Sequence, residues 1–351
     1  MRTSPSSRLM VTDRGRDHTR KDIMRTAIVG TGSYVPPKVI TNFDLEQMLD
    51  TSDEWIRRRV GIRERHVADD STATSDLGVI AAQRALDAAG MGPEDVDLVL
   101  CSTVSPDMPF PSTACIISRE LGIVSHVPAL DLGAACAGFS YAVHVADGLI
   151  RAGSHRTVLA IASETLTRFV DWTDRATCVL FGDGAGAAVL QAGDGESGIV
   201  YTRIGAESMY ADPNLLSIPA GGSRKPPTED TVRNREHTIH MEGRKLFKIA
   251  VSTMPEIALM VLDDAGFRVE DIDVFILHQM NVRIMETFAE RLGISIDKLL
   301  INVDRYGNTS SASTILAFDE GIRGGRVKKG DRVFFLTFGA GWAWGAAVVE
   351  V

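Results

Sequence analysis

The sequence predicts an α/β fold built from two related halves. Short apolar runs typical of buried strands alternate with segments whose apolar residues recur at helical spacing. Residues 262–273 repeat seven of the twelve residues at 86–97. A second similarity follows in the same order, between 181–189 and 338–348, where the later copy has two extra residues. Two repeats in one order favour duplication over chance.

The first copy supplies the expected elements of the N-terminal half. A helix over Ser75–Ala89 is expected to end at Gly90, because glycine accepts the left-handed conformation that closes helices. Strands are expected at Thr26–Val29, Leu98–Cys101, Ala129–Leu132 and Thr157–Ala162, and helices at Thr113–Leu121 and Ala137–Ile150. Since helices separate these strands, we expect parallel sheets covered by helices.

The second copy predicts a matching C-terminal half. A helix stop at Gly266 precedes a strand at Val274–Leu277, and a later helix is expected at Ala312–Phe318. The segment 221–234 is rich in Pro, Gly and charge and is expected to be a long surface loop. We expect the halves to be 24–196 and 197–351.

Residues 1–23 are expected to be a disordered tail. They carry scattered basic residues, together with Asp13, Asp17 and Asp22, and lack the apolar core of a secretory signal. Met24 is an alternative start.

The overall composition excludes several classes of function. A net charge of −9 disfavours general nucleic-acid binding, and no apolar run approaches the length of a membrane span. The four cysteines, Cys101, Cys115, Cys136 and Cys178, form neither a disulfide framework nor a metal pattern. We therefore expect a cytoplasmic protein without a metal site and without a nucleic-acid or membrane partner.

Two glycine-rich stretches resemble nucleotide-binding motifs and fail as such. The Gly30-Thr-Gly32 stretch lacks the third glycine of a dinucleotide fingerprint, and Pro36 and Pro37 prevent an immediate helix. Residues 181–186 lack the Lys-Ser/Thr of a P-loop, which favours close strand-to-helix packing. A serine hydrolase is poorly supported because no Gly-x-Ser-x-Gly occurs.

Cys136 is the candidate nucleophile. The Gly133-Ala-Ala-Cys-Ala-Gly-Phe139 segment lies between an expected strand and an expected helix, so Cys136 is placed at a sharp turn beside a helix N-terminus. That position is predicted to lower the thiol pKa and to make Cys136 the fastest-reacting cysteine. On these residues alone, a packed core cysteine is an equally good interpretation.

Two further polar residues follow apolar segments of the C-terminal half. His278 comes directly after the strand at Val274–Leu277, where α/β proteins usually bind ligands. Asn308 precedes the expected helix at Ala312–Phe318; alternatively, it is a helix cap. Cys136 lies 172 residues before Asn308, close to the repeat spacing, so the two helix-opening turns are expected to face each other.

These motifs resemble the 3-oxoacyl-[acyl-carrier-protein] synthase III family of the thiolase superfamily. The resemblance runs from about Met24 to the C-terminus and includes Thr51-Ser-Asp-Glu-Trp-Ile56 and Gly61-Ile-Arg-Glu-Arg-His66. It implies a thiolase-like, duplicated five-layer α-β-α-β-α architecture. It also implies a Cys136, His278 and Asn308 triad, which plant-type polyketide synthases share.

The resemblance implies a condensing acyltransferase that starts type II fatty acid synthesis. Cys136 would take a short acyl group from acyl-CoA, and condensation with malonyl-ACP would give 3-oxoacyl-ACP, CoA and CO₂. The backbone N–H groups of Cys136 and Ala340 would form an oxyanion hole, and no cofactor is implied. Alternatives are a secondary-metabolic relative that primes a polyketide or acylates another nucleophile, and a silent structural partner subunit.

Binding residues carry over from the same resemblance. Trp55 and Arg59 match the pair that holds the adenine of CoA. Phe110 matches a residue that crosses a homodimer interface to floor the partner's acyl pocket. Lys248 and Arg283 match a basic patch for acyl carrier protein. Further residues match the CoA tunnel: Thr51, Arg175, Phe247 and Asn281. Two positions depart from the family, which commonly has Ala at Met280 and Gly at Ala340.

Overall fold

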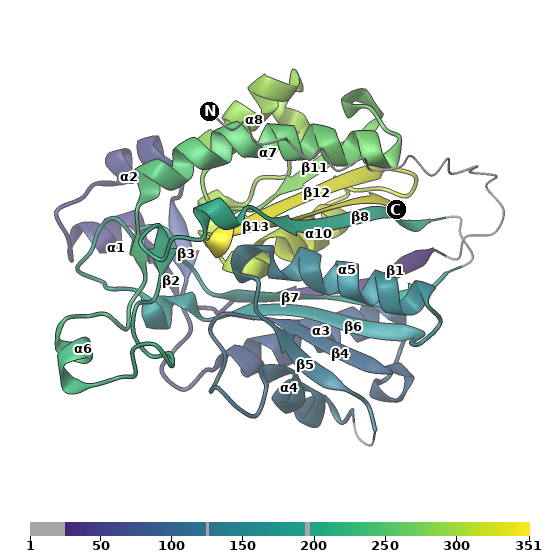
Figure 1. Ribbon diagram of the computed structural model, residues 1–351, viewed down its shortest axis with the longest axis horizontal. Coiled ribbons are helices and arrows are strands. Elements are labelled where there is room, and N and C mark those ends of the chain that lie inside the picture. The colour runs from purple at the N-terminus through teal and green to yellow at the C-terminus, as the bar shows by residue number, and fades with distance from the viewer. Residues whose placement is uncertain (1–24, 124–125, 194–196) are drawn as a thin grey trace, which may run out of the picture.

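The computed structural model describes residues 25–123, 126–193 and 197–351, so the expected tail at 1–23 lies outside it. Within the described residues, two main sheets lie in separate layers (Figure 1). The strands of the first sheet come from residues 26–192, and those of the second come from residues 198–350. Each main sheet is therefore contributed by one half of the sequence.

The first sheet has five strands. Their order is β1 (Thr26–Tyr34), β7 (Gly184–Ala192), β6 (Thr157–Glu164), β4 (Leu98–Ser102) and β5 (Ala129–Leu132). The second sheet has four strands in the order β8 (Gly198–Ala206), β13 (Ala343–Glu350), β12 (Arg332–Gly339) and β11 (Val274–Leu277). The second order repeats the first, except that only an isolated bridge between Phe275 and Leu299 stands where β5 would pair.

The sheets are mixed, so the expectation of parallel sheets is wrong. β4 is parallel to β5 and β6, and β11 is parallel to β12. However, β7 is antiparallel to both of its neighbours, and so is β13. For β13 the connection accounts for this direction: β12 reaches β13 through a short turn, Ala340–Trp342, and parallel neighbours need a long crossover.

Helices form three layers around the two sheets (Figure 1). The central layer holds α5 (Gly138–Arg151) and α10 (Ser313–Arg323), and each of these helices contacts strands of both sheets. α3 (Thr74–Ala89) and α4 (Thr113–Leu121) cover the outer face of the first sheet. α7 (Gly243–Ala265) and α8 (Val282–Leu292) cover that of the second. This is the expected five-layer thiolase-like architecture.

Glycines in the similar stretches 181–189 and 338–348 allow the central helices α5 and α10 to pack closely against the sheets. A Cβ added at Gly186 of β7 would lie 2.5 Å from Ile315 of α10. A Cβ added at Gly345 of β13 would lie 2.5 Å from Ser140 of α5. The interpretation of the 181–189 stretch as close strand-to-helix packing is therefore confirmed, and the two halves use the same device.

The remaining elements form a cap at one end of the sheets, on the left in Figure 1. A buried apolar cluster joins this cap to residues 178–181. The expected loop at 221–234 contains the short helix α6, which begins after a Thr228 capping box. The elements of the cap are β2 (Val39–Thr41), α1 (Asn42–Glu46), α2 (Asp53–Val60), β3 (Glu64–His66), β9 (Leu216–Ser217), α6 (Glu229–Arg233), β10 (His240–Met241) and α9 (Val303–Tyr306).

Among the described residues, none of the helices combines the length and apolar character needed to cross a membrane. The four cysteines are free, as the absence of a disulfide framework in the sequence suggested.

Candidate active site

A cavity of about 260 Å³ lies where the two halves meet, and Cys136, His278 and Asn308 all line it. His278 and Asn308 follow Cys136 by 142 and 172 positions in the sequence, so the fold alone brings the three residues together. The rest of the wall is mostly apolar. Its apolar side chains include Val104, Leu166, Leu180, Phe181, Leu216, Ile218, Ile239, Met241, Leu246, Met280, Phe338 and Trp342.

Cys136 is held in a strained turn before α5. A 3₁₀ turn at Ala135–Ala137 links β5 to α5, and Ala135 has a φ of 47°, which is unusual for a residue other than glycine. The turn lies against the corresponding turn Ser310–Ala312 that precedes α10. The expectation that the two helix-opening turns face each other is confirmed.

The predicted low pKa of Cys136 is wrong. The residue is only 8% exposed, and burial raises the pKa of its thiol to about 12. A hydrogen bond from the Ser310 side chain lowers this pKa in part, and the Glu164 carboxyl raises it. The cost of burying a thiolate therefore outweighs the favourable position at a helix start in this ligand-free cavity. Cys115 is exposed, so a general alkylating reagent should reach Cys115 before Cys136.

His278 is fixed between the second sheet and α10. Its backbone N–H donates to Leu336 O at 2.9 Å, and Nδ1 lies 2.8 Å from Ser313 Oγ. Its ring meets Phe338 edge-on, with 5.4 Å between centroids. Burial lowers the pKa of His278 to about 3, so the imidazole is neutral at physiological pH. Nε2 has no hydrogen-bond partner among the described residues.

Asn308 is held by backbone from the first half. Its N–H donates to Leu180 O at 2.7 Å, and its carbonyl accepts from Gly182 N at 3.1 Å. Its side-chain Oδ1 accepts from Ser310 N at 2.8 Å. Because the carbonyl end of the amide is occupied, its NH₂ end is left to donate to a ligand. The interpretation of Asn308 as a helix-capping residue therefore describes only part of its role, because Asn308 caps a turn and also lines the cavity.

Sequence reasoning missed a buried carboxylate beside this site. Glu164, at the end of β6, is fully buried and accepts from Ser311 Oγ at 2.7 Å and Ser310 Oγ at 3.0 Å. Its second oxygen accepts from Ser105 Oγ, Val104 N and Thr103 Oγ1. Burial raises the pKa of Glu164, against the opposing effect of these donors. No sequence motif marks it, because its partners lie up to 147 positions away.

The backbone at position 340 accepts alanine, although the family commonly has glycine there. Ala340 lines the cavity and is not among the residues with positive φ, so a Cβ causes no strain there. The preceding Gly339 is more constrained, since a Cβ at that position would lie 2.6 Å from Cys136 N. Met280, the second departure from the family, lines the same cavity.

The predicted CoA residues Trp55, Arg59 and Arg175 lie together near the cap, and Arg175 is the side chain that packs on Trp55. The guanidinium of Arg175 lies over the Trp55 ring, 5.1 Å from the centroid, and its NH1 donates to Asp50 O at 2.7 Å. Arg59 is exposed on α2. Thr51 is half-buried nearby in sequence, before α2. The partner of Trp55 comes from a distant loop, which local spacing could not indicate.

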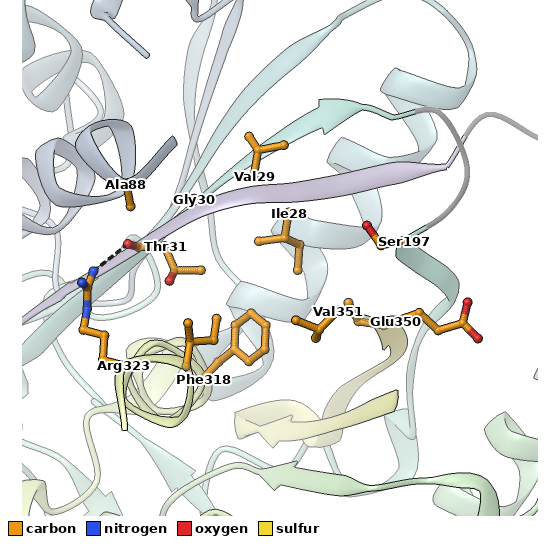
Figure 2. Close-up of a pocket in the computed structure, with 13 residues that line it drawn as sticks. Ile28, Val29, Gly30, Thr31, Ala88, Ser197, Phe318, Arg323, Glu350 and Val351 are labelled. Atoms are coloured by element: carbon orange, nitrogen blue, oxygen red, sulfur yellow. Dashed lines mark hydrogen bonds between the residues drawn. The ribbon is translucent and has the colours of Figure 1, made fainter. Parts of the chain in front are cut away.

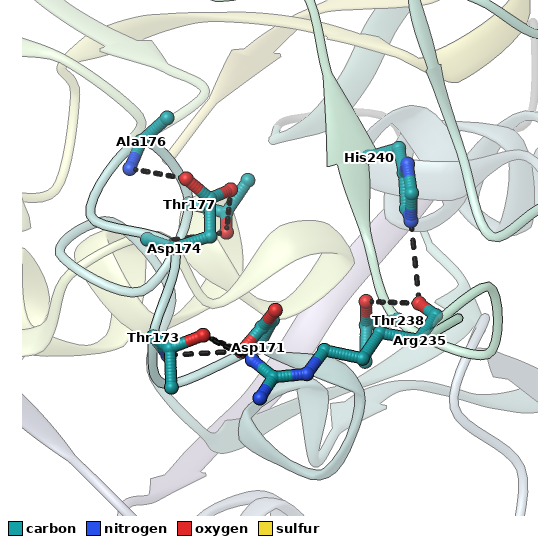
Figure 3. A network of polar contacts seen from close by, with 8 residues as sticks. All are labelled: Asp171, Thr173, Asp174, Ala176, Thr177, Arg235, Thr238 and His240. Atoms are coloured by element: carbon teal, nitrogen blue, oxygen red, sulfur yellow. Dashed lines mark hydrogen bonds and ion pairs between the residues drawn. The ribbon is translucent and has the colours of Figure 1, made fainter. Parts of the chain in front are cut away.

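The loop that carries Arg175 is tied to the segment before β10 (Figure 3). Arg235 NH1 donates to Asp171 Oδ1 at 2.5 Å and also contacts Thr173. The hydrogen bond from Arg235 lowers the pKa of Asp171 to about 2. On the same loop, Asp174 accepts from Ala176 N at 2.9 Å. Two segments of the cap are therefore joined by one exposed ion pair.

The other predicted binding residues lie on the start of α7 and α8. Arg283 lies over the Phe247 ring at 5.5 Å from its centroid, and both Arg283 and Lys248 are exposed. Asn281 is the N-cap of α8, since its Oδ1 accepts from Arg283 N at 2.9 Å. Its assigned contact with CoA can therefore involve only the amide NH₂.

Phe110 is 84% exposed and does not line the cavity of its own chain. Packing of Phe110 inside its own subunit is thereby excluded.

A second cavity, of about 290 Å³, lies between β1, α10 and the end of β13 (Figure 2). Its polar groups are paired, for example Arg323 NH2 with Thr31 O at 3.0 Å. None of the candidate residues lines it. Within the described ranges, His, Cys, Asp and Glu side chains form no cluster suited to a metal ion.

Comparisons with known proteins agree with this architecture. Residues 130–208 match the family model of 3-oxoacyl-[acyl-carrier-protein] synthase III, and residues 262–351 match the model of its C-terminal part. A beta-ketoacyl-[acyl-carrier-protein] synthase III from Caldanaerobacter subterraneus is 49% identical over 323 residues, covering 92% of this chain and 97% of the relative.

Solved structures show the same similarity. The crystal structure of 3-oxoacyl-[acyl-carrier-protein] synthase III from Aquifex aeolicus has a TM-score of 0.85 and 42% identity, covering 93% of this chain and 100% of that one. The priming beta-ketosynthase of the R1128 polyketide pathway has a TM-score of 0.85 at 33% identity, covering 95% and 98%. With nearly half of its residues identical to a relative that it matches over almost its whole length, the chain belongs to the 3-oxoacyl-[acyl-carrier-protein] synthase III family of condensing acyltransferases.

Proposed function

We propose that Cys136, His278 and Asn308 are the catalytic residues of this initiating condensing enzyme of fatty acid synthesis. The observation that carries the proposal is that one cavity is lined by Cys136, by His278, whose Nε2 has no partner among the described residues, and by Asn308, whose Oδ1 is held by Ser310 N–H. Acyl-CoA supplies the primer and malonyl-ACP supplies the extender. No cofactor is needed for either step.

The first half-reaction forms an acyl-enzyme. Cys136 sulfur attacks the thioester carbonyl of acyl-CoA, the bond to the CoA sulfur breaks, and the leaving CoA takes up the proton that the thiol loses. The backbone N–H groups of Cys136 and Ala340 hold the oxyanion. Because burial raises the pKa of the free thiol, we expect the proton to leave as the substrate binds or as the sulfur attacks.

The second half-reaction makes the carbon–carbon bond. Loss of CO₂ from malonyl-ACP leaves an electron pair that is delocalised onto the thioester oxygen, where His278 Nε2–H and the Asn308 amide donate hydrogen bonds. The carbanion then attacks the acyl carbonyl and expels the Cys136 thiolate. Neutral donors suit this step, and burial keeps His278 neutral.

The binding residues form a route from the surface to this cavity. We assign the adenine of CoA to Trp55 and Arg59, whose flat groups suit a planar base, and Arg175 supports the Trp55 ring by packing on it. Thr51, Phe247 and Asn281 line the approach, and the exposed Lys248 and Arg283 receive the acidic carrier protein. The ring of Phe110 floors the acyl pocket of a second copy in a cytoplasmic homodimer, which accounts for its 84% exposure in one chain.

The test is intact-mass detection of acylation after incubation with acyl-CoAs of two to twelve carbons, followed by addition of malonyl-ACP. We expect a short acyl adduct on Cys136, absent in Cys136→Ala, that is consumed as 3-oxoacyl-ACP and CO₂ form. A chain that is never acylated would be a silent partner subunit. Acylation followed by transfer to a small amine or alcohol, but not to malonyl-ACP, would favour the secondary-metabolic alternative.

That alternative has one observation in its favour, which is the 33% identity to the polyketide priming enzyme. The same residues serve both functions, so only the choice of acceptor separates them.

A further inference from the structure

His278 can act as a donor only in one of its two neutral forms. A neutral imidazole carries a single hydrogen, on Nδ1 or on Nε2. Nε2 has no partner among the described residues, and His278 lines the cavity. If the hydrogen were on Nδ1, a lone pair of Nε2 would face the thioester oxygen and repel the enolate. Whatever surrounds Nδ1 therefore decides whether the ring helps or hinders decarboxylation.

The group that faces Nδ1 is the hydroxyl of Ser313. Ser313 is the first residue of α10, is 2% exposed, and places Oγ 2.8 Å from Nδ1. The same Oγ accepts a longer hydrogen bond, of 3.4 Å, from the backbone N–H of Gln279. Among the described residues, His278 Nδ1 is the one acceptor within hydrogen-bond distance of the Ser313 hydroxyl, which favours donation of the hydroxyl hydrogen to Nδ1. The direction of this pair is thus Gln279 N–H to Ser313, and Ser313 O–H to His278.

The Gln279 backbone is held in place by its own side chain. Gln279 is buried, and Nε2 donates to Leu277 O at 2.8 Å and Leu300 O at 3.0 Å. Oε1 accepts from the N–H of Asn302 and of Val303. With both ends of the amide satisfied, the residue after His278 cannot rotate its N–H away from Ser313 without breaking buried hydrogen bonds.

The corresponding place in the first half has no such contact. Gly138 is the first residue of α5, as Ser313 is of α10, and Ser102 ends β4 where His278 follows β11. A Cβ at Gly138 would lie 1.7 Å from Ser102 Oγ, so only glycine fits there. The second half therefore carries an imidazole and a hydroxyl where the first half carries a close serine–glycine contact.

We propose that Ser313 is a positioning residue that holds His278 as the Nε2–H tautomer and so makes the imidazole a hydrogen-bond donor to the substrate carbonyl. The proposal rests on the proposed function for its catalytic consequence, although the tautomer can be measured without any substrate. Asn308 is set in the same manner by Ser310 N–H. Both donors are thus oriented by residues of one short segment, 310–313.

The first measurement is the tautomer. The full chain is labelled with ¹⁵N-histidine, and His278 is assigned as the pair of ring-nitrogen signals that disappears in His278→Gln. Near neutral pH we expect a protonated Nε2 and an unprotonated Nδ1 in the wild type, and a mixture of both forms in Ser313→Ala. A protonated Nδ1 in the wild type would overturn the proposal, and so would an unchanged tautomer in Ser313→Ala.

The second measurement separates the half-reactions. Ser313→Ala should lower malonyl decarboxylation about 10-fold or more, since the loss of one preorganised donor costs about 10²–10³ and the correct tautomer remains partly populated. Acylation of Cys136 by acyl-CoA should change by less than about threefold, and Ser313→Thr, which keeps a hydroxyl, should restore most of the rate. Equal loss in both half-reactions would indicate a merely structural role for Ser313.

The matched control is Thr314→Val. Thr314 is the next residue of α10, is fully buried, and its Oγ1 has no partner among the described residues. It should leave the tautomer and both half-reactions unchanged. If the wild type shows the expected tautomer but does not decarboxylate malonyl-ACP, the proposed function fails while the role of Ser313 in fixing His278 stands. If Ser313→Ala does not fold, the wild-type spectrum and Ser313→Thr still decide the question.

Discussion

The two halves of the chain carry the same turn, yet only the first turn presents its central residue to the cavity: Cys136 lines it and Ser311 does not. Ala135 and Ser310 have φ values of 47° and 51°, and they precede Cys136 and Ser311, which are equivalent residues of the duplicated fold. The strand that faces Cys136 ends in Gly339, whereas the strand that faces Ser311 ends in Glu164. The carboxylate fills on one side the space that glycine leaves open on the other.

We call the turn with Ser311 and Glu164 the closed side, and the turn with Cys136 and Gly339 the open side. Ser311 is fully buried, with Oγ 2.7 Å from Glu164 Oε1 and 3.2 Å from Ser102 O. These contacts join the two halves and place Ser311 outside the cavity wall. Of the two equivalent positions, one holds the proposed nucleophile and the other a buried polar contact between the halves. The repeat spacing placed Cys136 opposite Asn308, but its structural equivalent is Ser311.

The largest effect is expected from Cys136→Ser, which makes the two turns alike. A hydroxyl is a far weaker nucleophile than a thiol, and in the proposed tautomer the lone pair of His278 faces Ser313, so the imidazole would not act as a base for the introduced hydroxyl. Acylation measured by intact mass should fall about 10³-fold or more, by analogy with the loss of other enzymatic nucleophiles. Ser311→Ala is the matched change in the closed turn and should keep acylation within a few-fold of wild type.

A somewhat smaller loss is expected when the donors of the open side are removed. His278→Ala and Asn308→Ala should each lower malonyl decarboxylation by about 10² or more, because each removes one hydrogen bond to the enolate. Acylation should be affected much less, since the donors assigned to that step are backbone N–H groups. Decarboxylation that survives unchanged while acylation collapses would show that the roles are reversed.

Gly339→Ala tests whether the absence of a side chain at position 339 leaves the space that the Cys136 turn needs. Its Cβ would lie 2.6 Å from Cys136 N and 3.0 Å from Ala135 Cβ, so the nucleophile turn must shift. A misplacement of about 1 Å costs about 10² in rate, and acylation should fall by that order. Gly148→Ala is the control, because a Cβ on that residue of α5 meets nothing within 4 Å. Wild-type acylation by Gly339→Ala would refute the comparison.

The closed side is tested through stability. Glu164→Gln places an NH₂ group against hydroxyl or N–H donors that need an acceptor, and should lower the free energy of unfolding by about 1–3 kcal/mol in chemical denaturation. Asp183→Asn is a comparison within the first half, where Asp183 accepts from Thr167 and Ala68. Only Glu164→Gln should also slow decarboxylation, because Glu164 holds Ser310. Equal activity of the two variants would limit Glu164 to stability.

The smallest effect is expected from the cap over the open side. Arg235→Ala removes the ion pair with Asp171 and should raise the KM for acyl-CoA about two- to fivefold, since exposed pairs contribute about 0.2–1 kcal/mol. The kcat should be unchanged. Arg233→Ala, which breaks the neighbouring exposed pair with Asp230, is the control and should leave KM unaltered. A large fall in kcat would mean that the cap acts on the chemistry.

Local signals in the sequence were sufficient for individual elements. α4 has the predicted bounds because Ser112 caps its start and Gly122 closes its end, and β11 has the predicted bounds because apolar residues fill its whole length. The duplication and the family motifs also predicted that Cys136, His278 and Asn308 meet at one centre, and all three line one cavity. These features depend on residues close in sequence or on patterns that repeat.

The remaining features depend on distant contacts. Burial among residues from both halves raises the pKa of Cys136, the side chain over Trp55 is Arg175 from a distant loop, and β7 runs antiparallel to β6. None of these has a sequence pattern of its own. Glu164 was missed for the same reason: it is an ordinary residue at a strand end until the second half folds against it.

The central position of α10 affects how the protein folds while it is being synthesised on the ribosome. The inner face of the first sheet packs against α10, through contacts such as Gly186 with Ile315, and α10 ends at Arg323, close to the C-terminus. At about 5–20 residues per second, the N-terminal half emerges many seconds before this helix is made. Until then α5 covers its part of the inner face, while the part that α10 covers stays exposed, so the nascent chain is expected to depend on chaperones until α10 has emerged.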